Sequence, residues 1–288
     1  MDGLQGEMTR QRLSQQFALW LRAQPFVRGG LAGKTGAVSH SLEAIEQAIK
    51  AGCGVVLEAQ LTFDGDAIVF GEDTLDRLTT LRGHVHQYGS ARLQGQKLGG
   101  SNSTIMSLSC LLPEIAGRTP VLIDASRAPQ KDPLPLCFAI RRALEGYGGP
   151  LGILSPNPRV VAWFGEHARR VARGLLVLEG AKRTPWWQRT TLWRTVLLRR
   201  AHPDFCVFDH RALPSDFAQT LRRQSMPVLA CSVRTAEEAA AARCHADNII
   251  QDFEEHPIPA AAPAQPGPAR QPVAAARPEA GSGRVWAR

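Results

Sequence analysis

Apolar positions recur along this chain in two patterns that alternate. Short apolar runs predict strands, and runs with apolar residues every three or four positions predict helices. Strands are expected at 24–28, 55–62, 119–124, 150–155, 173–179, 204–209, 227–233 and 246–250. Helices are expected between them, at 41–52, 135–148, 158–170, 184–201, 214–223 and 235–243. A repeated strand-then-helix order indicates a parallel sheet.

Eight strands, most of them followed by a helix, favour a (β/α)8 TIM barrel, which typically needs roughly 250 residues. The predicted units fit within residues 24–256. After the second strand, Asp64 and Gly65 turn the chain into the apolar run 67–70, which adds a small hairpin. A loop-rich stretch at 83–104 follows. An open doubly wound sheet shows the same alternation and is the second fold compatible with the pattern.

Two segments flank the predicted barrel. Residues 1–23 are expected to form a short N-terminal helix that lies against it, because Leu13, Phe17 and Leu21 share one helical face, with Trp20 beside them. Residues 257–288 are rich in proline, alanine and glycine and bury too little apolar surface to fold, so a disordered tail is expected.

Composition restricts the class of protein further. The 34 Lys and Arg residues exceed the 26 Asp and Glu residues, and the resulting charge of +8 admits anionic partners such as phosphates, nucleic acid or lipid headgroups. No apolar run is long enough for a transmembrane helix, and the first residues do not resemble a secretory signal, so a cytoplasmic location is expected. The six cysteines are scattered without CxxC spacing, which predicts reduced core residues rather than disulfides or zinc ligands.

One long run carries a resemblance to a known family. LEAQLTFDGDAIVFGEDTLDRLT (57–79) resembles the signature of the glycerophosphodiester phosphodiesterases, in which an ELDVQLTKDG-type strand and turn lead into VVFHDxTLDRTT. Upstream, RGGL (28–31) and SLEAIEQAIKAG (41–52) resemble the family's HRG and ENSLEAF segments. Four downstream segments follow in the family's order: VLIDASR (121–127), NPRVVAWF (157–164), MPVLACSVRTAEEA (226–239) and ADNIIQDF (246–253). The chain is therefore identified as a divergent member of this family of phospholipase-C-like barrels.

The resemblance implies a metal-dependent phosphoric diester hydrolase. Cleaving a phosphodiester needs neutralisation of the non-bridging oxygens, an activated nucleophile and a proton for the departing alkoxide. In the family a divalent cation, Ca²⁺ or Mg²⁺, is held by three carboxylates, and two histidines form the acid–base pair. The products are glycerol 3-phosphate and an alcohol, which links the family to lipid metabolism.

The reactive positions of the family differ in this chain. The two histidine positions hold Val27 and Gly71, neither of which can transfer a proton. The three carboxylate positions hold Val56, the longer Glu58 and the shorter Asp124. Because general acid–base groups are each worth about 10²–10⁴ in rate, these changes predict impaired catalysis. With two carboxylates in place of three, a divalent cation is expected to be weakly bound or absent.

Some of the other family positions are retained in this chain and others are changed. Arg28 and Gly29 of HRG remain, and Arg28 is the predicted phosphate contact because its guanidinium presents a fixed fork of donors. The remaining changes are Ser39 and His40 for Glu and Asn of ENS, Glu72 for the acid after the second histidine, Ser126 for a lysine, Cys231 for a tryptophan, and Arg234 for an asparagine. The scaffold resembles the family more closely than the reactive positions do.

Several residues could replace the missing groups. His40 stands at the start of a helix and could approach the barrel mouth, or could simply cap the helix or lie at the surface. Asp209 and His210 end a strand near the rim, but adjacent residues of an extended chain point in opposite directions. His84 and His86 form an HxH on a loop that could add metal ligands, although no matching cluster accompanies it.

Three functions follow from the sequence. The first is a phosphodiesterase-like barrel that is catalytically impaired and binds a small phosphate-bearing ligand. The second is an active metal-dependent glycerophosphodiester phosphodiesterase with relocated acid–base residues. The third is a docking module for an anionic membrane or nucleic acid, suggested by the tryptophans and arginines of the helix at 184–201. The same helix is also explained by tryptophans that pack inward beneath a basic outer face.

Overall fold

The computed structural model describes residues 2–32, 37–177 and 191–252. Within these residues, eight parallel strands pair in the order β1-β10-β9-β8-β7-β6-β5-β2, and β1 pairs with β2 to close the ring. The strands are β1 (Phe26–Arg28), β2 (Gly54–Leu61), β5 (Val121–Asp124), β6 (Leu151–Ser155), β7 (Ala172–Val177), β8 (Phe205–Asp209), β9 (Val228–Val233) and β10 (Asn248–Gln251). The predicted TIM barrel is confirmed, and the open sheet is excluded because β1 has strand partners on both sides.

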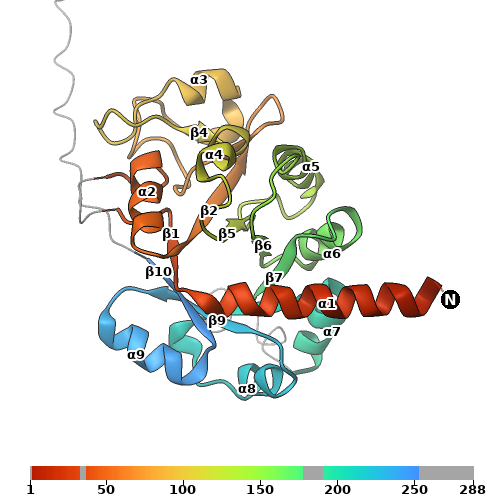
Figure 1. The fold of residues 1–288 in the computed structure, drawn as a ribbon. Helices are drawn as coiled ribbons and strands as arrows, with labels where there is room; N and C mark the ends of the chain where they lie inside the picture. The colour runs from red at the N-terminus through yellow and green to blue at the C-terminus, as the bar shows by residue number, and fades with distance from the viewer. Residues whose placement is uncertain (1, 33–36, 178–190, 253–288) are drawn as a thin grey trace, which may run out of the picture. The chain divides into compact units, whose positions relative to one another are not determined.

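Helices surround the barrel, as Figure 1 shows. They are α1 (Asp2–Ala23), α2 (Leu42–Lys50), α3 (Ser90–Gln94), α4 (Leu108–Ile115), α5 (Leu134–Ala143), α6 (Pro158–His167), α7 (Thr191–Ala201), α8 (Asp216–Arg223) and α9 (Ala236–His245). Helix α1 covers almost the whole segment 1–23 in which an N-terminal helix was expected. Of the helix expected at 184–201, the part before Thr191 lies outside the described residues, and so does the tail at 257–288.

The hairpin after the second strand is confirmed and extended. β3 (Ala67–Val69) pairs antiparallel with β2, and β4 (Met106–Ser107) pairs antiparallel with β3. The expectation of loops over 83–104 is wrong in part, because this stretch contains the 3-10 turn Val85–Gln87 and α3. Helix α4 was not predicted either, since it is short and carries Pro113 in its interior.

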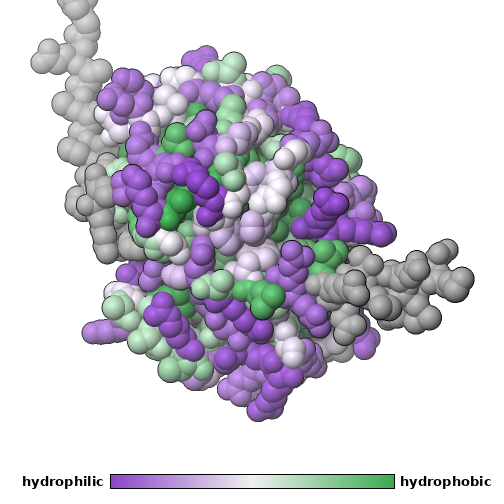
Figure 2. Space-filling view, in the orientation of Figure 1, coloured by the Kyte–Doolittle hydropathy of each residue, from purple (hydrophilic) through white to green (hydrophobic). Residues whose placement is uncertain are grey.

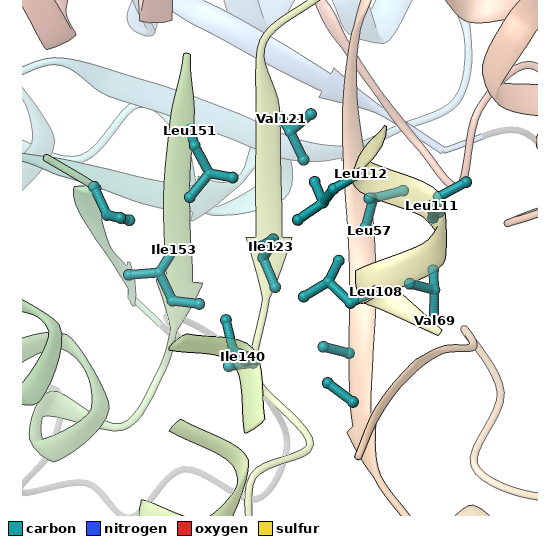
Figure 3. Close-up of a cluster of buried hydrophobic side chains, with 14 of the residues drawn as sticks. Leu57, Val69, Leu108, Leu111, Leu112, Val121, Ile123, Ile140, Leu151 and Ile153 are labelled. Carbon is teal, nitrogen blue, oxygen red and sulfur yellow. The ribbon is translucent and has the colours of Figure 1, made fainter. Parts of the chain in front are cut away.

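Two apolar layers hold the barrel together. The outer layer lies between the strands and the helices, and Figure 3 shows part of it, where Leu108, Leu111 and Leu112 of α4 face Leu57 of β2 and Val121 of β5. The inner layer fills the barrel itself with the opposite faces of the same strands: Phe26, Val56, Leu122, Leu154, Phe205, Val207, Leu229 and Ile250. Alternation along each strand therefore assigns every side chain to one layer or the other.

Helix α1 closes the end of the barrel at which the strands begin. Its Phe17 and Leu21 belong to the inner layer, and Figure 1 shows the helix running across the barrel. Asn248 at the start of β10 fixes the end of the helix, since its Nδ2 donates to the carbonyl oxygens of Leu21 at 2.6 Å and Gln24 at 2.7 Å. The expectation that this segment lies against the barrel is met, and the opposite end is left for the site.

The cysteines are free, as expected, but two of them are not core residues. All six cysteines are free; four are buried, whereas Cys110 and Cys244 are exposed. Figure 2 shows a face that is mainly hydrophilic, with small separate hydrophobic areas. Among the described helices, none combines the length and the apolarity that crossing a membrane requires.

Candidate functional site at the mouth of the barrel

Charged side chains meet where four neighbouring strands end. Arg28 ends β1, Glu58 lies in β2 and Asp124 ends β5, while Asp252 directly follows β10. Glu58 and Asp124 are partners in the strand register, so their side chains lie on the same face of the sheet. Because Val56 and Leu122, two residues earlier, belong to the inner layer, this face is the inside of the barrel.

The Arg28 guanidinium lies among the three carboxylates. Its Nη1 donates to Asp124 Oδ2 at 2.8 Å and lies 3.6 Å from Glu58 Oε1, and its Nε donates to Asp252 Oδ1 at 3.1 Å. Burial lowers the pKa of Arg28, but the three carboxylates outweigh it and raise the pKa above its ordinary value. Arg28 is therefore charged at any physiological pH. The other oxygen of Asp124 accepts from the backbone N–H of Ser126 at 2.9 Å and from its hydroxyl.

A second arginine approaches the same cluster from the loop after β5. Arg127 pairs with Asp73, donates to the carbonyl oxygen of Gly71 and lies 3.9 Å from Glu58 Oε1. Burial raises the pKa of Glu58 to about 7, with Asp124 adding to the rise, although Arg28 and Arg127 oppose it. Glu58 is thus flanked by two guanidinium groups and by a buried carboxylate.

His40 is part of this site, but not as a cap or a surface residue. The side chain that caps α2 is Ser41, whose hydroxyl accepts from the backbone N–H of Ala44 at 3.2 Å. His40 is 3% exposed and has a positive φ of 66°, and its backbone N–H donates to the carbonyl oxygen of Gly29 at 2.7 Å. The sharp turn after β1 that brings it there depends on Gly29, whose φ is +64°.

Both ring nitrogens of His40 have partners. Nε2 accepts from the backbone N–H of Glu58 at 3.3 Å, and Nδ1 lies 3.0 Å from the Ser39 hydroxyl. This arrangement assigns the ring proton to Nδ1. Burial and the nearby charges of Arg28 and Arg127 lower the pKa of His40 to about 3. The imidazole is therefore neutral, and its Nε2 also lies 3.5 Å from Glu58 Oε2.

Val27, Gly71 and Val56 supply neither a proton-transfer group nor a metal ligand. Val27 is fully buried in the outer layer, on the face of β1 opposite to Arg28. Val56 is fully buried in the inner layer. At Gly71, an added Cβ would lie 2.6 Å from His40 Cε1 and 2.8 Å from Glu58 Oε2, so the ring of His40 fills the space beside it.

Asp209 and His210 do not join the cluster. Arg211 donates to both carboxylate oxygens of Asp209, at 2.8 Å from Nε and 2.6 Å from Nη2, and these bonds lower the pKa of that carboxyl. His210 Nδ1 lies 3.3 Å from the carbonyl oxygen of Cys231, and Nε2 lies 3.5 Å from Glu238 Oε1. His210 Nδ1 also lies 3.8 Å from Asp209 Oδ1, but the closer contacts of Asp209 are those to Arg211.

A cavity of about 430 Å³ opens in front of the cluster. Three arginines contribute to its lining, together with His40 and carboxylates: Arg28, Arg77, Arg234, Glu58, Glu72 and Asp252. Arg77 donates to Glu72 Oε1 at 2.6 Å, so part of its charge is already paired. The cavity combines guanidinium donors, which suit phosphate, with carboxylate acceptors, which suit hydroxyl groups.

The donor set does not fit a tightly held divalent cation. Glu58 and Asp124 are the two carboxylates present at family positions, and both already face the Arg28 guanidinium. Within residues 2–32, 37–177 and 191–252, no three side chains of His, Cys, Asp or Glu are grouped so as to hold a metal ion. His84 and His86 stack with ring centroids 5.4 Å apart, and His84 Nδ1 lies 2.8 Å from the carbonyl oxygen of Asp73.

Comparison with solved structures shows which known proteins share this fold. A phosphodiesterase from Oleispira antarctica, solved with its product sn-glycerol 3-phosphate, matches with a TM-score of 0.63 at 16% identity over 82% of this chain and 95% of that one. A glycerophosphodiester phosphodiesterase from Thermotoga maritima matches with a TM-score of 0.62 at 16% identity, over 78% and 93% of the two chains. A candidate member from Galdieria sulphuraria gives 0.66 at 13% identity, over 80% and 93%. This chain has the fold of the glycerophosphodiester phosphodiesterases.

The likeness rests on structure, because neither the protein-family models nor the curated proteins give a match to this sequence. It covers most of the chain and agrees with the resemblance found along the sequence. At identities of this size it establishes the barrel and not the chemistry, since one fold supports many activities.

Sequence reasoning missed two members of the cluster. Asp252 pairs with Arg28, and Arg127 approaches Glu58. The signal for Asp252 was available, because a closed barrel brings the end of its last strand beside the end of its first. For Arg127 no local pattern distinguishes it from a surface arginine.

Proposed function

We propose that the mouth of this barrel binds a small phosphate-bearing ligand of the glycerol phosphate kind, and that phosphodiester cleavage there is slow or lost. The observation that carries the proposal is the cavity of about 430 Å³ lined by three arginines, in which His40 is neutral and bonded to the Glu58 backbone N–H. Its volume lies within the range of about 300–1,000 Å³ that is typical of small-molecule sites.

The lining favours a phosphate attached to a hydroxylated alcohol. Guanidinium groups bind phosphate oxygens through paired N–H donors, and charge-assisted bonds of this kind are the stronger ones. Arg234, which directly follows β9, and Arg77, in the segment after β3, both line the cavity, while Glu58 and Asp252 can accept hydrogen bonds from hydroxyls. The Oleispira antarctica neighbour, which holds sn-glycerol 3-phosphate, supports the same class of ligand.

Impaired turnover is expected because the site has few side chains that can transfer a proton. A diester needs a proton for its leaving alkoxide, and each general acid or base contributes about 10²–10⁴ in rate. Val27 faces away from the cavity, position 71 has no side chain, and both nitrogens of His40 have partners within the protein. The site therefore keeps the means to bind phosphate but has no side chain that can transfer a proton at positions 27 and 71. The lining carboxyl whose pKa is near 7, Glu58, lies between Arg28 and Arg127.

Calorimetric titration of chelator-treated protein with sn-glycerol 3-phosphate tests the binding. Glycerol is the phosphate-free control ligand, and binding of the phosphate ester alone is expected. Arg234→Gln and Arg77→Gln are each expected to weaken it about tenfold or more, as the loss of a charged hydrogen bond does. Arg82→Gln is the matched control, because Arg82 is 90% exposed in the same region. Equal affinities for all four proteins, or no binding, would contradict the proposal.

Turnover is a separate measurement. Glycerophosphocholine is incubated with the folded protein, with Ca²⁺ or Mg²⁺ and with chelator, and release of glycerol 3-phosphate is followed. No release is expected. Metal-dependent release that Asp124→Ala abolishes would instead support the alternative, an active phosphodiesterase with relocated acid–base residues. Salt-sensitive binding to anionic vesicles or nucleic acid, without binding of the small ligand, would support the docking module.

A further inference from the structure

Three carboxylates converge on a single side chain at the barrel mouth. Asp124 comes from β5, Glu58 from β2 and Asp252 from the residue after β10, so the group is assembled only when the barrel closes. Side-chain exposure is 4% for Asp124, 17% for Glu58 and 23% for Asp252. Carboxylates that are this close and this sheltered repel one another unless a cation lies among them.

We propose that the Arg28 guanidinium is the resident cation of this cluster and occupies it in place of a divalent metal ion. Carboxylate oxygens are the ligands that Ca²⁺ and Mg²⁺ prefer, but in the described residues these three acids are spread around the guanidinium and not grouped for a metal ion. In this chain they are neutralised by a side chain covalently attached to β1. The mouth of the barrel is thus assembled without metal, whether or not the proposed phosphate ligand binds there.

The geometry makes the guanidinium and a metal ion mutually exclusive. Nη1 of Arg28 is 2.8 Å from Asp124 Oδ2 and 3.6 Å from Glu58 Oε1. A Ca²⁺ ion bound to the same two oxygens would need distances of about 2.3–2.6 Å to each, so it would compete with Nη1 for both of them. The second oxygen of Asp124 is already used by Ser126. A metal ion could therefore enter only by expelling Arg28 from between the acids.

Arg28 is also held from its other side. Nε donates to Asp252 at 3.1 Å, while Nη1 donates to Asp124. The guanidinium therefore links the residue after β10 to the end of β5. Displacing it would break both bonds and leave a sheltered positive charge beside an incoming dication. Arg127, 3.9 Å from Glu58, adds to the repulsion that an incoming metal ion would meet.

Removing the arginine while keeping the acids gives a direct test. Chelator first removes metal ions from wild type, Arg28→Met and the control Arg82→Met. Thermal unfolding is then measured with and without about 5 mM CaCl₂ or MgCl₂. This concentration exceeds the dissociation constants of even weak protein Ca²⁺ sites. Wild type and Arg82→Met are expected to show no change in melting temperature. Arg28→Met is expected to melt lower in chelator and to be raised by several degrees by Ca²⁺, with half-saturation on the order of 10⁻⁴–10⁻³ M.

Two further variants secure the interpretation. Arg28→Met combined with Asp124→Asn is expected to lose the Ca²⁺ effect, because one of the three acids is gone. Arg28→Lys keeps a fixed positive charge and is expected to stay insensitive to metal, as wild type does. A Ca²⁺-induced rise in wild type equal to that in Arg28→Met would overturn the inference, and so would an Arg28→Met chain that Ca²⁺ neither stabilises nor refolds. Since phosphate ester binding is measured in chelator, its failure would leave these results unchanged.

Discussion

The imidazole of His40 occupies the space that a side chain at position 71 would need. A Cβ built on Gly71 would lie 2.6 Å from Cε1 of the ring and 3.0 Å from Nδ1. The two residues come from different segments, the loop before α2 and the segment that follows β3. With the ring of His40 and the Glu58 carboxylate in place, position 71 therefore has no room for a side chain.

Substituting Gly71→Ala is expected to lower the free energy of unfolding by about 1–3 kcal/mol, the cost of overpacking a filled site. Urea denaturation measures it. The control is Gly148→Ala, because a Cβ there meets nothing within 4 Å. In a background of His40→Asn, which removes the ring, the penalty at position 71 is expected to shrink by about half or more. Equal penalties in both backgrounds would show that the ring is not what fills the space.

The stability of the protein should fall on acidification because of His40. Its pKa is lowered to about 3 in the folded chain, from an ordinary value of 6.5. Between these values the unfolded chain binds the extra proton, so the free energy of unfolding decreases by about 1.4 kcal/mol for each pH unit below 6.5. His40→Asn removes this dependence, and asparagine also tolerates the positive φ at this position.

Urea denaturation at pH 6.5 and pH 4.5 provides the measurement. The advantage of wild type over His40→Asn is expected to be smaller at the lower pH by about 2–3 kcal/mol. His86→Asn, which removes an exposed histidine, is the control. A difference between wild type and His40→Asn that stays constant with pH would mean that the ring is not kept neutral by burial.

The fold could be predicted from the sequence because strands and helices alternate and their apolar residues recur with clear periods. Val121–Asp124 and Leu151–Ser155 are short apolar runs, and the cap of α6 is signalled by Asn157 followed by Pro158. Helix α4 was missed because Pro113 within it reads as a break. In the structure the helix tolerates this proline, and Leu108, Leu111 and Leu112 bury against β2 and β5.

Only part of the site could be predicted from the sequence. Arg28, Glu58 and Asp124 could be placed at the mouth by their positions at strand ends, but nothing local states that the arginine lies between the two acids. The buried state of His40 depends on the turn at Gly29 and on the vacant side chain at Gly71, which lie 42 residues apart in the chain. Juxtapositions of this kind are set by closure of the barrel and not by a motif.

Reintroducing a histidine at position 27 is not expected to restore catalysis. Val27 is fully buried in the outer layer near Ile45 and Leu57, so a histidine there enters an apolar shell and faces away from the cavity. We expect Val27→His to lower the free energy of unfolding by about 1–3 kcal/mol, the cost of a buried polar group without a partner. Release of glycerol 3-phosphate from glycerophosphocholine is expected to stay at the wild-type level. An increase in that release would show that the strand presents position 27 to the mouth.

Asn248 is expected to be the main polar attachment of α1 to the barrel. Its Nδ2 donates to the carbonyl oxygens of Leu21 and Gln24, and its Oδ1 accepts from the backbone N–H of Ile249 at 2.8 Å. Asn248→Ala leaves those two sheltered carbonyl groups without a donor, which costs about 1–3 kcal/mol. Because Phe17 and Leu21 stay in the inner layer, the helix should loosen rather than detach. Amide hydrogen exchange is expected to speed up over the last turns of α1 and stay unchanged in β5 and β6, whereas uniform acceleration would indicate global destabilisation instead.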